Sequence, residues 1–189
     1  MLPEGSVEGS PIVERALPTE PVVRGSASLF LTEAAGQGVT GGRKMLYVGL
    51  EPATDRVARA LGVEPGSDVL ARRKLLSVNA VPVRIATSYL RADLFDGTAL
   101  AGEDFLEPSL QEAIEALGYR FGHAEERLIA RPSTPSEART LRTDPAEWVV
   151  QILRVSFNRD GTPVHALETI CAASRHVFPV RQFPGSDEF

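Results

Sequence analysis

The feature that most constrains the fold of this chain is an internal repeat at a constant offset of 80 residues. The segment EPATDRVARALGVEP, residues 51–65, aligns with RPSTPSEARTLRTDP, residues 131–145. Six positions are identical in the two copies: Pro52, Thr54, Ala58, Arg59, Leu61 and Pro65 match Pro132, Thr134, Ala138, Arg139, Leu141 and Pro145. Recurrence at a fixed offset indicates two copies of one structural unit.

Each copy opens with signals for the start of a helix. The run TPSE that begins at Thr134 has the pattern of a capping box with a proline at the first helical position. Thr54 precedes Asp55, which places a capping hydroxyl beside an acid in the first turn. The sequence therefore predicts a short helix after each threonine.

A β-hairpin is expected after each helix. Residues 69–76 and 149–157 are apolar enough to form strands, and each ends in a polar loop. The return strands open at Pro82 and Pro163, a position where proline removes no central ladder hydrogen bond. The alternative is two unrelated segments with common turn chemistry, but the shared register favours two helix-plus-hairpin units.

The remaining segments complete an α+β fold, an antiparallel sheet with flanking helices. A strand is expected over residues 45–50 and a short helix over 28–35. A capped helix that begins at Ser109 leads into a strand over residues 119–130. Residues 176–182 alternate in polarity, which predicts a further edge strand.

The length of 189 residues fits one domain with an arm. Residues 1–26, rich in Pro, Gly and Ser, are interpreted as a linker-like arm outside the core. Residues 27–182 form the predicted domain, and 183–189 a tail. No apolar run approaches the roughly 20 residues that cross a bilayer.

Composition excludes several classes of function. The net charge of −5 is opposite in sign to a nucleic-acid-binding surface. Cys171 is the only cysteine, so the chain has no intrachain disulfide and no zinc thiolate cluster, and we expect it to be a small core residue. The N-terminus lacks the pattern of a secretory signal. This absence and the single cysteine favour a location of the protein in the cytoplasm. No phosphate-loop, dinucleotide or zinc-protease motif occurs, so no cofactor or metal is expected.

Strand alternation sorts the candidate ligand-binding residues. Arg84 and Ser88 are predicted to share one face of the sheet with His165 and Thr169 of the second return strand. Lys74 and Arg154 occupy equivalent positions of the two outgoing strands and could converge on an anion. On spacing alone, solvated edge charges are the favoured interpretation.

Two further candidates stand apart from this set. Ser109 begins a helix whose free N–H groups could meet an anion, although a capped surface helix needs no ligand. Trp148 opens a strand and is expected in the core.

The order of these segments resembles the UTRA domain, the effector-binding module of HutC-type transcription regulators in the GntR superfamily. The resemblance covers residues 27 to 182. The segments that carry it are ARALGVEPGSDVL (58–70), PVRIATSYLRADL (82–94), SLQEAIEALGY (109–119), RPSTPSEARTL (131–141), RVSFNRDGTPV (154–164) and SRHVF (174–178). It implies a chorismate-lyase-like fold, a small-molecule pocket and a homodimer.

The resemblance also implies which positions meet the ligand. Members that bind phosphosugars carry an Arg-x-Arg pair where this chain has Lys74 and Leu76. Two glutamates of the family are replaced by Ala86 and His165, and a tyrosine by Cys171. These departures predict an effector other than an aminosugar phosphate. We place it between the two hairpins, on Lys74 with Arg84, His165 and Ser109 nearby.

The function expected from this resemblance is effector sensing for a transcription regulator. The winged helix-turn-helix of such regulators needs roughly 60–70 residues, and only about 26 precede the match, so the chain is either a fragment or a free-standing sensor. DNA would be bound only through that missing module. The alternatives are a chorismate-lyase-like enzyme on the same fold and a DNA-free partner that dimerises with a full-length regulator.

Overall fold

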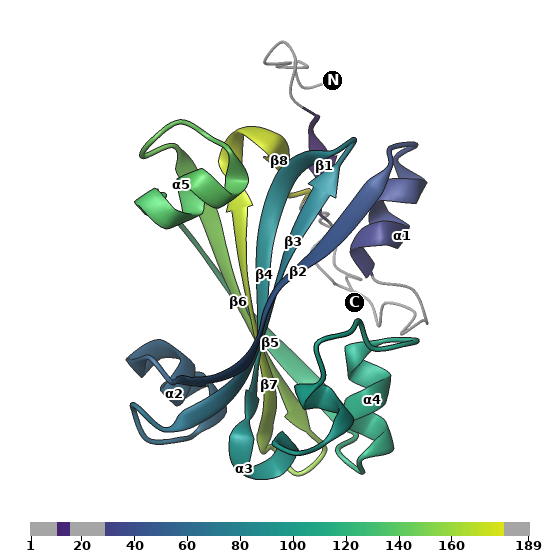
Figure 1. The fold of residues 1–189 in the computed structure, drawn as a ribbon, viewed down its shortest axis with the longest axis vertical. Helices are drawn as coiled ribbons and strands as arrows, with labels where there is room; N and C mark the ends of the chain where they lie inside the picture. The colour runs from purple at the N-terminus through teal and green to yellow at the C-terminus, as the bar shows by residue number, and fades with distance from the viewer. Residues whose placement is uncertain (1–10, 16–28, 180–189) are drawn as a thin grey trace, which may run out of the picture.

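The computed structural model describes residues 11–15 and 29–179, and its main feature is one six-stranded antiparallel sheet in the order β2-β3-β4-β7-β6-β5 (Figure 1). The strands of this sheet are β2 (Gly41–Pro52), β3 (Asp68–Val78), β4 (Val81–Arg91), β5 (Phe121–Pro132), β6 (Trp148–Asn158) and β7 (Pro163–Ala172). The other elements are β1 (Val13–Glu14), α1 (Leu29–Gly36), α2 (Asp55–Leu61), α3 (Ala92–Phe95), η1 (Ala99–Ala101), α4 (Leu110–Ala116), α5 (Pro135–Leu141), η2 (Ala173–Arg175) and β8 (His176–Val177). The α+β class is confirmed.

The internal repeat is confirmed as a structural repeat. The units β2–α2–β3 and β5–α5–β6 have identical element bounds once 80 is added to the first. The return strands β4 and β7 pair with each other at the centre of the sheet, so both hairpins lie in one sheet. Each unit therefore contributes one half of the sheet.

Both predicted helix caps are present. The Val57 N–H donates to Thr54 Oγ1 over 3.4 Å at the start of α2. The Thr134 hydroxyl accepts from the Glu137 N–H over 3.2 Å, and the Glu137 carboxylate accepts from the Thr134 N–H over 2.8 Å. The capping box predicted for α5 is thus complete, whereas α2 has the hydroxyl cap alone.

Helices cover both faces of the sheet. α2 and α5 lie on one face, where Leu61 and Leu141 are fully buried against the sheet (Figure 1). We call this the α2–α5 face. The opposite face packs against α1 and the segment from α3 to α4 through residues such as Phe30, Phe95 and Ile114. We call it the α1–α4 face. Within the described residues, no helix is long and apolar enough to cross a membrane.

The prediction that residues 1–26 stay outside the core is wrong for residues 11–15. Val13 is fully buried in the cluster that includes Phe30 and Ala86, and β1 pairs in parallel with β8. Arg15 also forms an ion pair with Glu126 of β5. The groove that buries this short segment forms only when the chain has folded. The composition of residues 1–26 therefore does not reveal it. Residues 1–10 and 16–28 lie outside the described part of the chain.

Two predictions at strand ends also need correction. The edge strand expected over 176–182 is only the two-residue β8, which lies in a separate two-stranded sheet; residues 180–182 and the tail are not described. Trp148 is 56% exposed, because it stands at the first position of β6 beside the edge strand β5. Cys171, by contrast, is fully buried as expected.

A single arginine links the two repeat units through hydrogen bonds to backbone carbonyls. The buried Arg175 guanidinium donates to the carbonyls of Pro82 and Leu141 over 2.6 and 2.7 Å, and to that of Arg142 over 3.1 Å. It thereby ties the start of β4 to the C-terminal end of α5.

Replacing Arg175 by alanine should lower the free energy of unfolding by about 2–4 kcal/mol, because three carbonyl groups lose a charged donor. Urea denaturation measures this change. Arg59→Ala, an exposed position on α2, is the control and should change stability by less than about 0.5 kcal/mol. Equal stability of the two variants would show that the hydrogen bonds of Arg175 do not contribute to the free energy of unfolding.

Candidate functional site

Strand register brings most of the predicted site residues together on the α1–α4 face. One row across the sheet joins Lys74, Ala86 and Thr169, which are direct neighbours on β3, β4 and β7. The next row contains Ser88 and Arg154, each of them opposite Leu167. Six of the seven predicted residues occupy this face: Lys74, Arg84, Ser88, Arg154, His165 and Thr169. We call the group formed by Lys74, Ser88, Arg154, His165 and Thr169 the Lys74 site.

The ammonium group of Lys74 is the uncompensated charge of this site. Burial lowers the pKa of Lys74, and the positive charges of Arg43 and Arg72 lower it further. No carboxylate offsets this effect, and in the described part of the chain Lys74 has no hydrogen bond or ion pair. A desolvated cation among other cations is costly unless an anion joins it. The site is therefore suited to an anionic group.

His165 supplies a neutral imidazole next to this charge. Burial lowers the pKa of His165 to about 3, and the nearby charges of Arg154 and Lys74 act in the same direction. The imidazole is thus uncharged at neutral pH. Its Nε2 atom is buried and has no hydrogen-bond partner among the described residues. A buried ring nitrogen without a partner is a candidate contact for a polar group of a ligand.

Ser88 and Thr169 add hydroxyl groups to the same face of the sheet. Both residues are buried, with 4% and 5% of their surface exposed. A hydroxyl both donates and accepts, so these two side chains can bond to a charged or a neutral oxygen. The Lys74 site therefore combines cations, a neutral imidazole and two hydroxyls on one face of the sheet.

Arg84 shares this face but is committed to structural contacts. Its guanidinium donates to His176 Nε2 over 2.7 Å and to Glu33 over 3.1 Å, and it stacks over the Phe30 ring. These partners come from α1 and β8, so Arg84 ties both elements to β4. Its NH2 atom alone is left without a described partner. A role in ligand binding stays a prediction.

Ser109 is committed in a different way. Its hydroxyl accepts from the Glu112 N–H over 3.1 Å and so caps α4. The helix has only seven residues, and no described hydrogen bond joins Ser109 to the Lys74 site. The structure gives no direct link between Ser109 and Lys74, and the ligand contact predicted for it is untested.

Arg43 and Arg72 are neighbours of the site that are not among the predicted ligand-binding residues. Arg72 donates to the carbonyls of Leu100 and Asp104 over 2.6 Å each, which holds the η1 segment in place. Arg43 forms a 2.8 Å ion pair with Glu107 and lies over the Phe105 ring. Arg43 precedes the strand that the sequence predicts from residue 45, whereas β2 starts at Gly41, so that prediction did not place Arg43 on the sheet.

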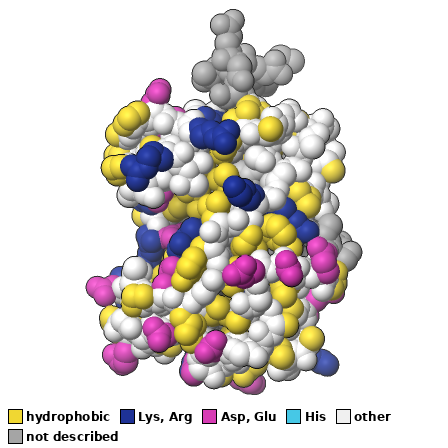
Figure 2. All heavy atoms as spheres, viewed as in Figure 1, with side chains coloured by type: hydrophobic (Ala, Val, Ile, Leu, Met, Phe, Trp, Pro, Cys, Tyr) yellow, Lys and Arg dark blue, Asp and Glu magenta, His cyan; other side chains and the backbone are white. Residues whose placement is uncertain are grey.

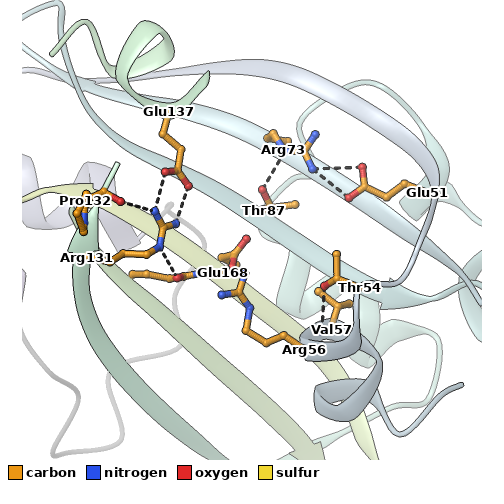
Figure 3. A network of polar contacts seen from close by, with 11 residues as sticks. Glu51, Thr54, Arg56, Val57, Arg73, Thr87, Arg131, Pro132, Glu137 and Glu168 are labelled. Atoms are coloured by element: carbon orange, nitrogen blue, oxygen red, sulfur yellow. Dashed lines mark hydrogen bonds and ion pairs between the residues drawn. The ribbon is translucent and has the colours of Figure 1, made fainter. Parts of the chain in front are cut away.

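The α2–α5 face carries a larger polar network, but its charges are balanced (Figure 3). Three arginines and three glutamates pair as Arg73–Glu51, Arg131–Glu137 and Arg56–Glu168. Figure 2 shows basic and acidic side chains together around a hollow on the left of the molecule, where Figure 1 places α5 above α2. Each of these three arginines is paired with a carboxylate. An anionic ligand would therefore be stabilised less by this network than by Lys74.

Metal binding has no support in the described residues. No group of three or more His, Cys, Asp or Glu side chains there could hold a metal ion. Burial also raises the pKa of the Cys171 thiol to about 11, so the thiolate form is scarce at neutral pH.

Comparisons with known proteins agree on one family. The UTRA domain model matches residues 36–177. An HTH-type transcriptional regulator of Streptomyces coelicolor is 34% identical over 130 residues, which are 65% of this chain and 47% of that protein. The HTH-type transcriptional repressor PhnF of Mycolicibacterium smegmatis is 26% identical over 182 residues, covering 94% of this chain and 72% of PhnF.

A solved structure has the same fold. The effector domain of PhnF from Mycobacterium smegmatis aligns with a TM-score of 0.72 at 23% identity, over 91% of this chain and all of that domain. The chain spans about half the length of the first curated relatives, 47% of the Streptomyces protein and 57% of a transcriptional regulator of Rhizobium meliloti.

The buried imidazoles predict how stability depends on pH. Burial lowers the pKa of both His165 and His176 to about 3, below the value of about 6.5 in an unfolded chain. Below pH 6.5 the unfolded chain therefore binds more protons, and the free energy of unfolding falls as the pH falls. Between pH 7 and pH 5, we expect each imidazole to remove about 2 kcal/mol.

Urea denaturation over this pH range tests the contribution of His165. In His165→Gln, the fall in the free energy of unfolding between pH 7 and pH 5 should be smaller than in the wild type by about 2 kcal/mol, the contribution of one imidazole. His123→Gln, at an exposed position of β5, is the control and should leave the dependence unchanged. A wild-type slope in His165→Gln would mean that His165 is not held neutral in the folded protein.

Proposed function

The chain belongs to the UTRA domain family, and from this premise we propose that it binds a small-molecule effector on behalf of a GntR-family transcription regulator of the HutC type. Its homologues are transcription regulators. We further propose that it acts in the cytoplasm as a homodimer. The observation that carries the proposal is the position of Lys74, which is partly buried on the α1–α4 face near the charges of Arg43 and Arg72 and has no described hydrogen bond or ion pair.

The chemistry of the site favours an effector with one anionic group. Lys74 and Arg154 supply positive charge, and His165 remains a neutral hydrogen-bonding partner. A charge-assisted hydrogen bond stabilises a carboxylate or phosphate more than a neutral group. We propose that this group binds at Lys74, with Ser88, Thr169 and His165 contacting the neighbouring part of the molecule.

The remainder of the effector is expected to carry little charge. Ala86, between Lys74 and Thr169, is 3% exposed, and Cys171 is fully buried with its thiol protonated. Leu76 follows Lys74 on the same face of β3 and is buried as well. These apolar side chains occupy positions where the phosphosugar-binding pattern has arginine, glutamate and tyrosine. The polar groups that this pattern offers to an aminosugar phosphate are therefore absent at these three positions, which favours a different anion.

Substitution of Lys74 tests the site directly. Native mass spectrometry of protein purified from its source identifies a retained effector by mass, and calorimetric titration then compares variants. Lys74→Ala should weaken binding by about one to two powers of ten, since a charge-assisted hydrogen bond contributes about 1.5–3 kcal/mol.

The matched control is Lys44→Ala on the neighbouring strand. Lys44 is exposed and lies opposite Leu75, whose side chain is on the α2–α5 face. This variant should bind the effector with wild-type affinity. Equal affinities of Lys74→Ala and wild type would move the site away from Lys74.

DNA recognition is proposed to belong to a different module of the regulator. The net charge of −5 disfavours contact with a phosphate backbone. We expect the 189-residue chain to give no sequence-dependent shift of duplex DNA at physiological salt in a gel assay. A specific shift by this chain alone would contradict the proposal.

We propose that the effector is bound without chemical change. Incubation with chorismate should release no pyruvate above the level of a Lys74→Ala sample. Turnover that depends on Lys74 would instead favour the chorismate-lyase-like alternative.

A further inference from the structure

Lysine is rare in this chain, and one of its lysines lies in the Lys74 site. The sequence has 20 lysine and arginine residues, of which only Lys44 and Lys74 are lysines. In the described part of the chain, arginine is the cation of the ion pairs on both faces of the sheet, and neither lysine takes part in one. A guanidinium group keeps its charge, whereas an amine can lose its proton. Among the cations around this site, only Lys74 can therefore become a nucleophile.

Two guanidinium groups flank Lys74 along the strands. Arg72 precedes Lys74 by two residues on β3. Arg43 of β2 lies opposite Leu76, which follows Lys74 by two residues. Residues at this spacing share one face of a sheet. The two arginines therefore stand on either side of the Lys74 side chain, on the α1–α4 face.

Both guanidinium groups are held in place by partners of their own. Arg72 is buried and donates to three backbone carbonyls between residues 100 and 104. Arg43 forms its 2.8 Å ion pair with Glu107. These contacts keep two positive charges beside the amine, which itself has no described hydrogen bond or ion pair.

This environment favours the neutral, reactive form of the amine. Burial lowers the pKa of Lys74, and the charges of Arg43 and Arg72 lower it further. A lysine that is desolvated next to other cations is activated as a nucleophile, because more of it is unprotonated at neutral pH. Lys44 lies on the neighbouring strand β2 with its side chain exposed, so the chain contains its own reference amine.

We propose that Lys74 forms a reversible imine with small aldehydes or ketones that carry a carboxylate, the class that includes the 2-oxo acids. The neutral amine nitrogen adds to the carbonyl carbon, and one amine proton moves to the carbonyl oxygen to give a carbinolamine. The hydroxyl then leaves with the second amine proton as water, and the C=N bond forms. No oxidant or reductant is consumed, and hydrolysis returns the amine and the carbonyl compound.

The carboxylate is specified by the charges that remain when Lys74 is neutral. Arg43 and Arg72 stay positive, and a negative group on the carbonyl compound is attracted to them, whereas a neutral aldehyde is not. Ser88 and Thr169 offer hydroxyl groups on the same face. The inference rests on the Lys74 site of the proposed function and adds a covalent class of ligand, whereas the proposed effector binds the ammonium form.

Reductive trapping with glyoxylate tests the proposal on the 189-residue chain. Sodium cyanoborohydride converts an imine of glyoxylate into a stable carboxymethyl-lysine, and mass spectrometry of peptides then compares Lys74 with Lys44 in the same molecule. At neutral pH, Lys74 should be modified at least about tenfold faster than Lys44, because more of its amine is unprotonated. With acetaldehyde, which has no carboxylate, the ratio of the two rates should be smaller.

Lys74→Arg separates this inference from the proposed function, because arginine keeps the charge but has no amine that forms this imine. Circular dichroism checks that the variant is folded. It should still bind inorganic phosphate in a calorimetric titration, whereas glyoxylate should leave no adduct at residue 74.

Two results would overturn the imine. One is modification of Lys44 as fast as or faster than that of Lys74, and the other is an equal rate ratio with glyoxylate and acetaldehyde. A wild type that forms the adduct but does not bind phosphate would instead contradict the anion site of the proposed function. The two proposals can therefore fail separately.

Discussion

The structure depends on the antiparallel pairing of β4 with β7, the seam between the two repeat units. Each unit alone would be a hairpin with an extra strand and one short helix, and its apolar face would have no complete partner. The seam sets Ala86 opposite Thr169 and Thr87 opposite Glu168. That register decides which side chains of one unit meet those of the other. A shift by one residue would exchange the two faces of a whole unit.

Because of this seam, the two faces of the sheet have different chemistry. On the α2–α5 face, Glu168 of β7 receives Arg56 from the other unit and Gln151 from its own, and charge is compensated across the seam. On the α1–α4 face, burial and the positive charges of Arg43 and Arg72 lower the pKa of Lys74. The α2–α5 face therefore compensates its charges across the seam, whereas on the α1–α4 face an anion bound beside Lys74 would stabilise the charged form of that one side chain.

The sequence predicted well what is decided by local chemistry and the repeat. Thr54 and Thr134 cap their helices because capping depends on residues within one turn, and the hairpins follow from alternation and turn residues. The face of Lys74, Ser88, His165 and Thr169 follows from strand parity. Tertiary contacts were harder to predict. Arg84 is held by Glu33 and His176, 51 and 92 residues away. Val13 is buried although its surroundings in the sequence resemble a linker, and Trp148 is exposed because its neighbour is an edge strand.

The most direct test of the Lys74 site is an NMR measurement of the Lys74 side-chain pKa, with and without the effector recovered from native protein. Burial next to Arg43 and Arg72 should hold this pKa below the ordinary value for a lysine side chain, about 10.4. A bound anion should raise it, because the anion stabilises the charged form. A Lys74 pKa at the ordinary lysine value, or one that does not change when the effector binds, would contradict the assignment of the anion to this side chain.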